Sequence, residues 1–358
     1  MKESEKENYT LFDLPPALHD AMIADIEKAR DYIFLETYKF GNDSVGRRFR
    51  DALTLKAKEG VKIKLLIDSW GAGVGLSFFN EMISHGAEVR FFKKIVLAFD
   101  FFTKNHRRNH RKLLLIDDKI TYIGSANIAG HSINWRELQL RIEGKITKHF
   151  KNTFLASIKL YRKYIFNKFN YRKTINHCGF EIIQDMPSIY RQRIKKRYET
   201  LIDKARREIV IETPYFIPGF KLRKKLMEAA ARGIDVKIIM PEHSDVRIVD
   251  LLRNKYLGQM HRNKVNILFY TPTNLHAKAA LFDNEIFGIG TTNFDYRSFR
   301  YMYEIMLFGR NKTIVTSLRK HMDETIKDCI PFDYDAWLNR PVIEKIISQL
   351  LVPFRHLF

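Results

Sequence analysis

The residues best suited to chemistry in this sequence belong to a short pattern that occurs twice. Both copies read His-x-Lys-x4-Asp-x6-Gly-Ser/Thr-x-Asn around an apolar run that predicts a strand. Residues i and i+2 of a strand point to the same face, so the histidine and the lysine of each copy share a face. The first copy contains His110, Lys112, Asp117, Ser125 and Asn127, and the second contains His276, Lys278, Asp283, Thr291 and Asn293.

These residue types suit the chemistry of a phosphodiester. An imidazole can attack phosphorus or carry a proton near neutral pH, while lysine, amide and hydroxyl donors hold the non-bridging oxygens. Two such sets facing each other would place a nucleophile on one side of the phosphorus and a general acid on the other, as in-line displacement requires. One copy alone would be explained as an ordinary strand with a polar edge, but two full copies favour the catalytic interpretation.

A metal site is the competing interpretation of this residue set, since two histidines and a carboxylate can bind a divalent cation. The paired lysines would repel such a cation. We therefore predict a site with no metal and no cofactor.

The duplicated motif resembles the signature of the phospholipase D superfamily. Within it the chain is similar to bacterial cardiolipin synthases, through residues 35–38, 213–218, 275–278, 293–304 and 337–341. The resemblance implies an α/β fold of two tandem duplicated α/β-sandwich domains with the active site at their interface. Transmembrane helices common at the amino terminus of one subgroup are absent, so the chain looks like the short type. Thr291 stands where the motif usually has serine, and it keeps the hydroxyl.

The resemblance also implies a mechanism through a covalent phosphohistidine. By analogy with the family, His110 is the nucleophile and His276 the general acid and base, because nothing in the sequence breaks the symmetry between them. Lys112, Lys278, Asn127 and Asn293 would bind the phosphoryl oxygens, with Ser125 and Thr291 assisting or orienting.

Each histidine needs a partner for its second ring nitrogen, to fix its tautomer and angle. Glu137 lies 27 residues after His110 and Glu304 lies 28 residues after His276, which matches the family's histidine-orienting glutamate. Asp117 and Asp283 complete the catalytic motifs, and we expect them to order the hairpin turns rather than to touch substrate.

The duplication extends beyond the motifs. Residues 29–37 align with 205–213, and each predicts a strand. Residues 57–66 align with 230–239, and each predicts a helix, a glycine stop and a strand. We therefore divide the chain into a first domain at residues 1–175, which includes a basic amphipathic helix, and a second domain at residues 176–358, which ends in an amphipathic helix.

Three segments have apolar residues that could contact lipid. Residues 93–104 are apolar and flanked by lysines, which suits either a bilayer edge or a packed loop. Residues 145–175 predict one basic helix whose aromatic face packs on the first domain and whose basic face lies on anionic lipid or in solvent. The stripe within residues 342–351 is expected to dock in the core rather than to serve as a free membrane anchor.

Composition points to an anionic partner. The 358 residues include 62 Lys and Arg against 41 Asp and Glu, a net charge of +21, which suits anionic lipid headgroups such as phosphatidylglycerol, or nucleic acid. Nucleic acid is the less expected of the two, because the aromatic residues sit in apolar runs rather than between basic residues. The sequence does not fix an oligomeric state.

Localisation follows from the same composition. The charged amino terminus does not begin a signal peptide, and nowhere do 18 apolar residues run together. Two cysteines give no disulfide framework. We predict a peripheral protein on the cytoplasmic side of the cell membrane, without signal peptide or transmembrane helix.

The leading functional hypothesis is a cardiolipin synthase that transfers a phosphatidyl group from phosphatidylglycerol to a second phospholipid. A hydrolytic phospholipase D would use the same residues with water as acceptor. A phosphodiesterase, nuclease or nucleic-acid-binding protein of the same superfamily is the third alternative.

Overall fold

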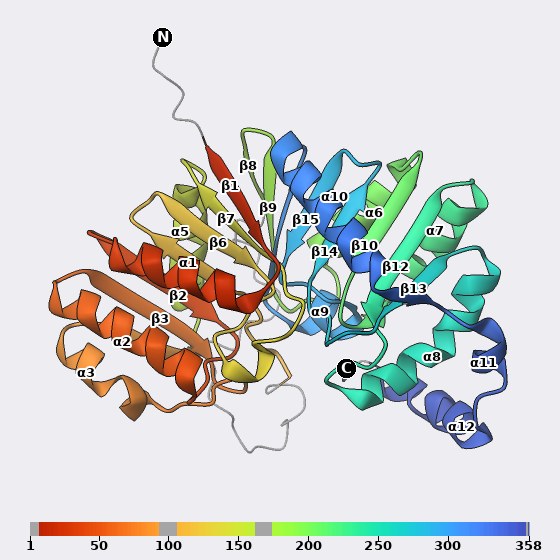
Figure 1. The fold of residues 1–358 in the computed structure, drawn as a ribbon, viewed down its shortest axis with the longest axis horizontal. Helices are drawn as coiled ribbons and strands as arrows, with labels where there is room; N and C mark the ends of the chain where they lie inside the picture. Colours follow the sequence, from red (N-terminus) through yellow and green to blue (C-terminus); the bar gives the residue numbers. More distant parts are fainter. Residues whose placement is uncertain (1–6, 93–105, 162–173, 356, 358) are drawn as a thin grey trace, which may run out of the picture.

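The computed structural model of the protein describes residues 7–92, 106–161, 174–355 and 357 (Figure 1). The apolar segment at 93–104 lies outside these residues, so its contact with a bilayer edge stays a prediction.

The first half of the chain forms a seven-stranded sheet in the order β1-β7-β6-β5-β2-β3-β4. Strands β2, β3 and β4 are parallel and the other pairs are antiparallel. The strands are β1 (Asn8–Phe12), β2 (Tyr32–Thr37), β3 (Lys62–Asp68), β4 (Glu88–Phe92), β5 (Leu113–Ile116), β6 (Ile120–Gly124) and β7 (Gln139–Glu143). The helices are α1 (Pro15–Glu27), α2 (Ser44–Lys58), α3 (Asn80–Ser84) and α5 (Thr147–Ile158), with 3-10 turns η1 (Leu76–Phe79) and η2 (Gly130–Ser132).

The second half forms a nine-stranded sheet in the order β18-β13-β12-β10-β14-β15-β17-β9-β8. Its strands are β8 (Thr174–His177), β9 (Phe180–Asp185), β10 (Glu208–Glu212), β12 (Asp235–Pro241), β13 (Asn266–Tyr270), β14 (Ala279–Phe282), β15 (Ile286–Gly290), β17 (Glu304–Gly309) and β18 (Cys329–Pro331). A separate pair joins β11 (Phe216–Ile217) to β16 (Phe294–Asp295). The helices are α6 (Arg193–Lys204), α7 (Phe220–Ala231), α8 (Arg247–Arg262), α9 (Tyr296–Tyr301), α10 (Lys312–Lys327), α11 (Tyr334–Leu338) and α12 (Val342–Leu350), followed by η3 (Val352–Phe354).

The two sheets repeat one topology. The order β7-β6-β5-β2-β3-β4 in the first matches β17-β15-β14-β10-β12-β13 in the second. The predicted fold class, two tandem α/β units, is therefore confirmed.

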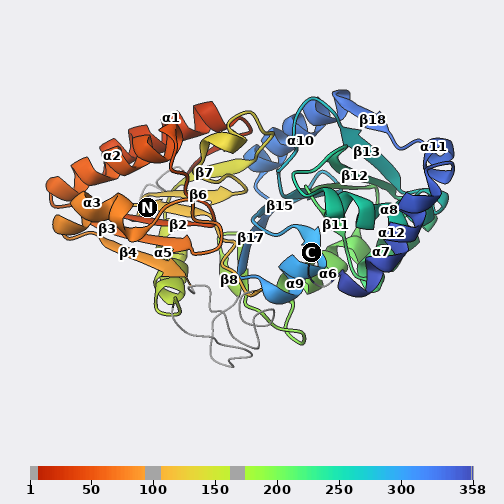
Figure 2. The ribbon, with the colours of Figure 1, turned by 90° about the horizontal axis from the view of Figure 1, so that it is seen from below.

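One apolar core joins the two halves. It combines side chains of both sheets with those of α5 and α10, and includes Leu115 and Leu140 from the first half and Ile289 and Ile305 from the second, all at most 1% exposed. The outer faces are covered by α1, α2 and α3 on one sheet and by α6, α7 and α8 on the other (Figures 1 and 2). Strands buried on both faces need apolar side chains on both, which explains the run from Leu113 to Ile116.

Two amphipathic helices differ from their predictions. The predicted basic helix is shorter, because α5 ends at Ile158 and Thr174 already belongs to β8; its aromatic face is buried as expected, at Phe150 and Phe154. The predicted burial of the stripe in α12 is wrong, since Ile343 is 60% exposed and Leu350 is 65% exposed. Across the described ranges, no helix combines the length and hydropathy needed to span a bilayer.

Candidate active site

The two motifs meet at the junction of the halves because each is paired with backbone from the other half. His110 N donates to Tyr303 O at 3.0 Å, and His276 N donates to Arg136 O at 2.8 Å. Isolated bridges join Asn109 to Tyr303 and Arg136 to Leu275. Each histidine therefore stands at the start of its hairpin, directly beside the residue that precedes the other half's glutamate.

The two histidine–glutamate pairs cross between the halves. His110 Nδ1 lies 3.0 and 3.3 Å from the carboxylate oxygens of Glu304. His276 Nδ1 lies 2.8 and 3.0 Å from those of Glu137. Both glutamates thus contact a histidine, but each serves the motif distant in sequence rather than the one it follows. With Nδ1 engaged in each ring, Nε2 is the nitrogen left for substrate.

Ser125 and Thr291 hold these glutamates from behind. The hydroxyl of Ser125 lies 2.5 Å from Glu137 Oε2 and accepts from Leu138 N at 2.8 Å. Thr291 Oγ1 lies 2.5 Å from Glu304 Oε2 and accepts from Ile305 N at 3.0 Å. Both hydroxyls therefore contact the glutamates that contact the histidines.

The two glutamates differ in pKa, which is lowered for Glu137 and raised for Glu304. Burial raises the pKa of Glu137, but the charge and hydrogen bond of His276 and the charge of Lys278 outweigh it and bring the pKa to about 2. Burial raises the pKa of Glu304 to about 8, and the charge of Asp295 adds to the rise. Glu137 is therefore ionised at neutral pH, whereas burial favours the neutral acid form of Glu304.

A neutral Glu304 fits its contacts. Its Oε2–H can donate to Thr291 Oγ1, which in turn reaches Ile305 O at 3.2 Å, while Oε1 accepts from Nδ1–H of His110. This arrangement leaves Nε2 of His110 without a proton.

Burial lowers the pKa of both imidazoles. The pKa of His110 is held well below its usual value by burial and by the charges of Lys112 and Lys278. The pKa of His276 is also lowered by burial, but the carboxylate of Glu137 opposes the shift. His110 is therefore suited to act as a free base, and His276 is the better supported as a cation.

Both motif lysines are buried, at 2% exposure for Lys112 and 1% for Lys278. Lys112 Nζ donates to His110 O at 2.8 Å, and Lys278 Nζ donates to His276 O at 2.7 Å. Burial lowers the pKa of Lys112 to about 7, aided by the charge of Lys278, and burial lowers the pKa of Lys278 to about 8. An anionic phosphoryl group between them would restore both charges.

The two asparagines are also buried, each at 6% exposure. Asn127 Oδ1 accepts from Lys39 N at 3.3 Å. Asn293 Oδ1 has no hydrogen-bond partner among the described residues.

Asp117 and Asp283 lie at the far ends of their strands from the histidines. The carboxylate of Asp117 accepts from the backbone N–H groups of Arg30, Asp31 and Tyr32 at 2.7 to 2.8 Å. That of Asp283 accepts from the N–H groups of residues 206, 207 and 208. Both aspartates have positive φ, 52° and 55°, as the tight hairpin turns require. Their role is to fix the hairpins against β2 and β10.

Several residues near the histidines were missed at the level of sequence. The ring of Tyr38 lies 5.3 Å from that of His110, and the ring of Trp135 lies 5.3 Å from that of His276. The charge of Arg297 acts on the pKa of His110. Asp68 accepts from Asn109 N at 2.8 Å. Tyr38, Asp68 and Trp135 lie outside the duplicated motif, so the repeat gave no signal for them.

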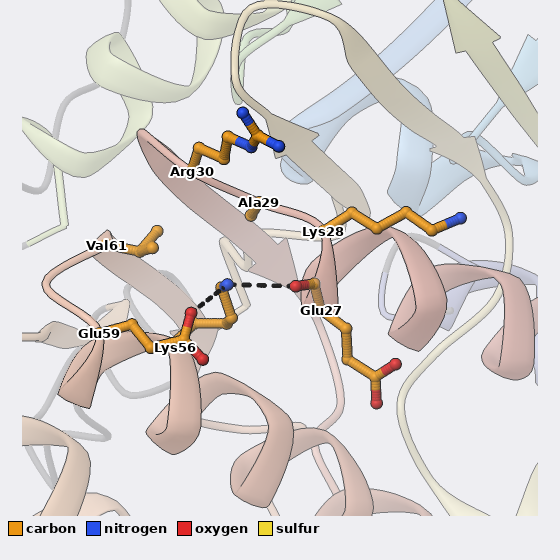
Figure 3. A pocket seen from close by; sticks show the side chains of 7 residues that line it. All are labelled: Glu27, Lys28, Ala29, Arg30, Lys56, Glu59 and Val61. Atoms are coloured by element: carbon orange, nitrogen blue, oxygen red, sulfur yellow. Dashed lines mark hydrogen bonds and ion pairs between the residues drawn. The ribbon is translucent and has the colours of Figure 1, made fainter.

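One surface pocket lies away from the histidines, and its side chains give no reason to regard it as an alternative active site. It lies at the ends of α1 and α2 and has a volume of about 460 Å³ (Figure 3). Its Lys56 donates to Glu27 O at 3.1 Å and pairs with Glu59, so its cation joins the two helices. In the part of the chain that the structure describes, no three His, Cys, Asp or Glu side chains gather as a metal site would require.

Comparison with known proteins identifies the family. The model of the cardiolipin synthase, phospholipase D-like domain matches residues 22–158 and 198–326. The chain belongs to this family. The cardiolipin synthase of Clostridium perfringens strain SM101 is 31% identical over 352 residues, covering 94% of this chain and 74% of that protein. The major cardiolipin synthase of Bacillus subtilis is 33% identical over 348 residues, covering 93% of this chain and 72% of that protein.

A solved structure supports the fold of this phospholipase D-like chain. The phosphatidylserine synthase of Haemophilus influenzae superposes with a TM-score of 0.76 at 13% identity, covering 98% of this chain and 95% of that one. The likeness concerns the fold alone.

Proposed function

We propose that this protein is a cardiolipin synthase that transfers a phosphatidyl group from one phosphatidylglycerol to another. The observation that carries the proposal is the crossed pair of histidines, each held at Nδ1 by a glutamate of the other half, with two buried lysines beside them. The relatives named cardiolipin synthases support the choice of reaction.

The first step forms a covalent intermediate. Nε2 of His110 attacks phosphorus, and the bond from phosphorus to the oxygen of the headgroup glycerol breaks. His276 gives its proton to that oxygen. Glycerol leaves and the phosphatidyl group stays on His110. The neutral imidazole of His110 and the carboxylate behind His276 support these roles.

The second step resolves the intermediate. His276 takes a proton from the primary hydroxyl of a second phosphatidylglycerol, whose oxygen attacks phosphorus and displaces His110. Cardiolipin is released. The phosphoryl oxygens are bound in both steps by Lys112, Lys278, Asn127 and Asn293. The hydrogen bonds from these side chains strengthen as the oxygens gain negative charge.

Two further assignments belong to this proposal. The division into domains at residues 1–175 and 176–358 is supported by the two separate sheets, although β8 of the second sheet begins at Thr174. The cytoplasmic side of the membrane is supported by the unpaired Cys178 and Cys329.

The experiment supplies the purified protein with phosphatidylglycerol vesicles, without added metal, and resolves the lipid products. Wild-type protein is expected to release one glycerol for each cardiolipin formed, and His110→Ala and His276→Ala are each expected to abolish turnover. His85→Ala is the matched control, because His85 is exposed and outside the site. Phosphatidic acid as the sole lipid product would instead establish a hydrolase.

A further inference from the structure

The helix α12 turns its apolar face away from the protein. Val342 is 67% exposed, Ile343 60%, Ile346 49% and Leu350 65%, and Phe354 in η3 is 53% exposed. A surface helix of a globular protein normally buries its apolar stripe against the core. We call these five residues the α12 face.

The opposite side of the same segment is fixed to the protein. Ser348 is 1% exposed, and Leu351 and Val352 pack on a cluster formed by Ile217, Val249, Leu252 and Tyr256. Before α12, the indole N–H of Trp337 donates to Asn254 O at 2.8 Å, which holds α11 on α8. The α12 face is therefore presented by a docked helix and is not a frayed end.

Cations surround the end of this segment. The guanidinium of Arg355 lies 5.4 Å from the ring centre of Tyr296, and that of Arg300 lies 4.5 Å from the same ring. Arg223 lies 3.9 Å from the ring of Tyr256. Among the described residues, neither Arg300 nor Arg355 has a carboxylate within ion-pair distance, so their charges are available to an anionic partner, whereas Arg223 donates to Pro218 O at 2.5 Å.

The segment also leads to the candidate active site. Tyr296, which contacts Arg355, starts α9 directly after β16, and β16 follows Asn293 of the second motif. Seen from below, α12 and the carboxy-terminal end beside α9 share one side of the molecule (Figure 2). The α12 helix and the carboxy-terminal end thus lie on one side of the molecule, and the short stretch of β16 and the start of α9 connects Tyr296 to Asn293 of the candidate site.

We propose that the α12 face is the docking surface for an anionic phospholipid bilayer. The helix has nine residues and a length of about 14 Å, so it lies in the interface plane with its apolar side chains among the acyl chains. The arginines near its end contact lipid phosphates. The choice of lipid as partner rests on the proposed function.

Charge favours a bilayer over a second copy of this chain. Each copy carries a net charge of +21, so two α12 faces brought together would also bring the neighbouring arginines together. Anionic headgroups instead neutralise these arginines while the acyl region takes up the apolar side chains.

The test measures flotation of the full-length protein with two kinds of vesicle. One contains phosphatidylglycerol and phosphatidylcholine in equal parts, and the other contains phosphatidylcholine alone. The double variant Ile346→Glu/Leu350→Glu is expected to bind the anionic vesicles at least about tenfold more weakly than wild type. Ile346→Trp is expected to bind as wild type does, because tryptophan is favoured at the interface.

Leu55→Glu is the matched control, since Leu55 is 52% exposed on α2 and is expected to leave binding unchanged. Thermal unfolding and gel filtration of each variant establish that it is folded. Turnover of phosphatidylglycerol in detergent micelles is expected to persist in the double variant, which separates docking from chemistry.

Equal binding of wild type and the double variant to anionic vesicles would overturn the docking proposal. So would a shift of the double variant from dimer to monomer on gel filtration, which would assign the α12 face to a second copy. Wild-type protein that binds vesicles through α12 but makes no cardiolipin in micelles would instead overturn only the proposed function.

Discussion

The two orienting glutamates have matched geometry but different charge, and this predicts unequal effects of the same substitution. Glu137 is ionised beside His276, with its pKa at about 2, whereas the pKa of Glu304 beside His110 is about 8. Glutamine resembles a neutral carboxylic acid in shape and hydrogen bonding but cannot replace a carboxylate. Glu137→Gln is therefore expected to be far more damaging than Glu304→Gln.

The magnitudes follow from the contacts. Glu137→Gln removes a charge-assisted hydrogen bond to Nδ1 of His276, formed at 2.8 Å, which is worth about 1.5–3 kcal/mol and corresponds to a roughly ten- to 150-fold loss of rate. In Glu304→Gln, the amide oxygen accepts from His110 and the amide N–H donates to Thr291. That exchange of neutral hydrogen bonds is expected to slow turnover less than about fivefold.

The assay measures turnover of phosphatidylglycerol in detergent micelles as a function of pH. His276 must be protonated to act as the acid, and the charge of Glu137 raises its pKa, so Glu137→Gln is expected to move the alkaline limb to lower pH. Glu304→Gln is expected to leave that limb in place. Equal losses of rate in the two variants, or an alkaline limb that Glu137→Gln does not move, would refute this account of the site.

Two further predictions concern Asp117 and His321, and a third concerns the absence of a metal from the mechanism. Asp117→Asn weakens three hydrogen bonds to backbone N–H groups, so thermal unfolding should show a loss of about 1–3 kcal/mol while turnover of the folded enzyme falls less than about tenfold; a larger loss of turnover would place Asp117 in the chemistry. Burial lowers the pKa of His321, but Glu212 and Asp13 outweigh it and raise the pKa to about 9. Because the folded pKa is above the unfolded value of about 6.5, His321→Gln should cost about 3 kcal/mol at low pH. That cost should shrink as pH rises through about 9, and a pH-independent difference would contradict the charge assignment. Chelation with EDTA should leave turnover unchanged, and activity that a divalent cation restores after EDTA would require a metal.

Much of the fold could be predicted because the chain carries its organisation twice. The alignment of residues 29–37 with 205–213, and the apolar runs before Asp117 and Asp283, are local signals of strands and turns. The expectation of an active site at the interface of the two domains came from the family resemblance.

The crossing of the glutamates could not be read from spacing. Glu137 and Glu304 each stand at a fixed distance from a histidine in sequence, but which histidine they contact depends on how the halves dock. Docking is decided by side chains spread over both sheets, such as Leu140 and Ile305, which carry no local signature of their partners.

The orientation of α12 cannot be predicted from the sequence for a related reason. Periodicity shows that Ile343, Ile346 and Leu350 share a face, but the same pattern results whether that face meets the core or a bilayer. In the folded protein, Leu351 and Val352 pack on the cluster that includes Val249 and Leu252, and the apolar stripe of α12 stays exposed.

The most direct test of the proposed mechanism is to quench the enzyme during turnover of phosphatidylglycerol and to locate the covalent phosphatidyl group by mass spectrometry. We expect the group on the peptide that contains His110 in the wild type. His276→Ala is expected to accumulate it from a phosphatidyl donor with a good leaving group, which departs without a proton from His276. A phosphatidyl group on His276, or cardiolipin formation with no covalent intermediate on either histidine, would contradict the proposed mechanism.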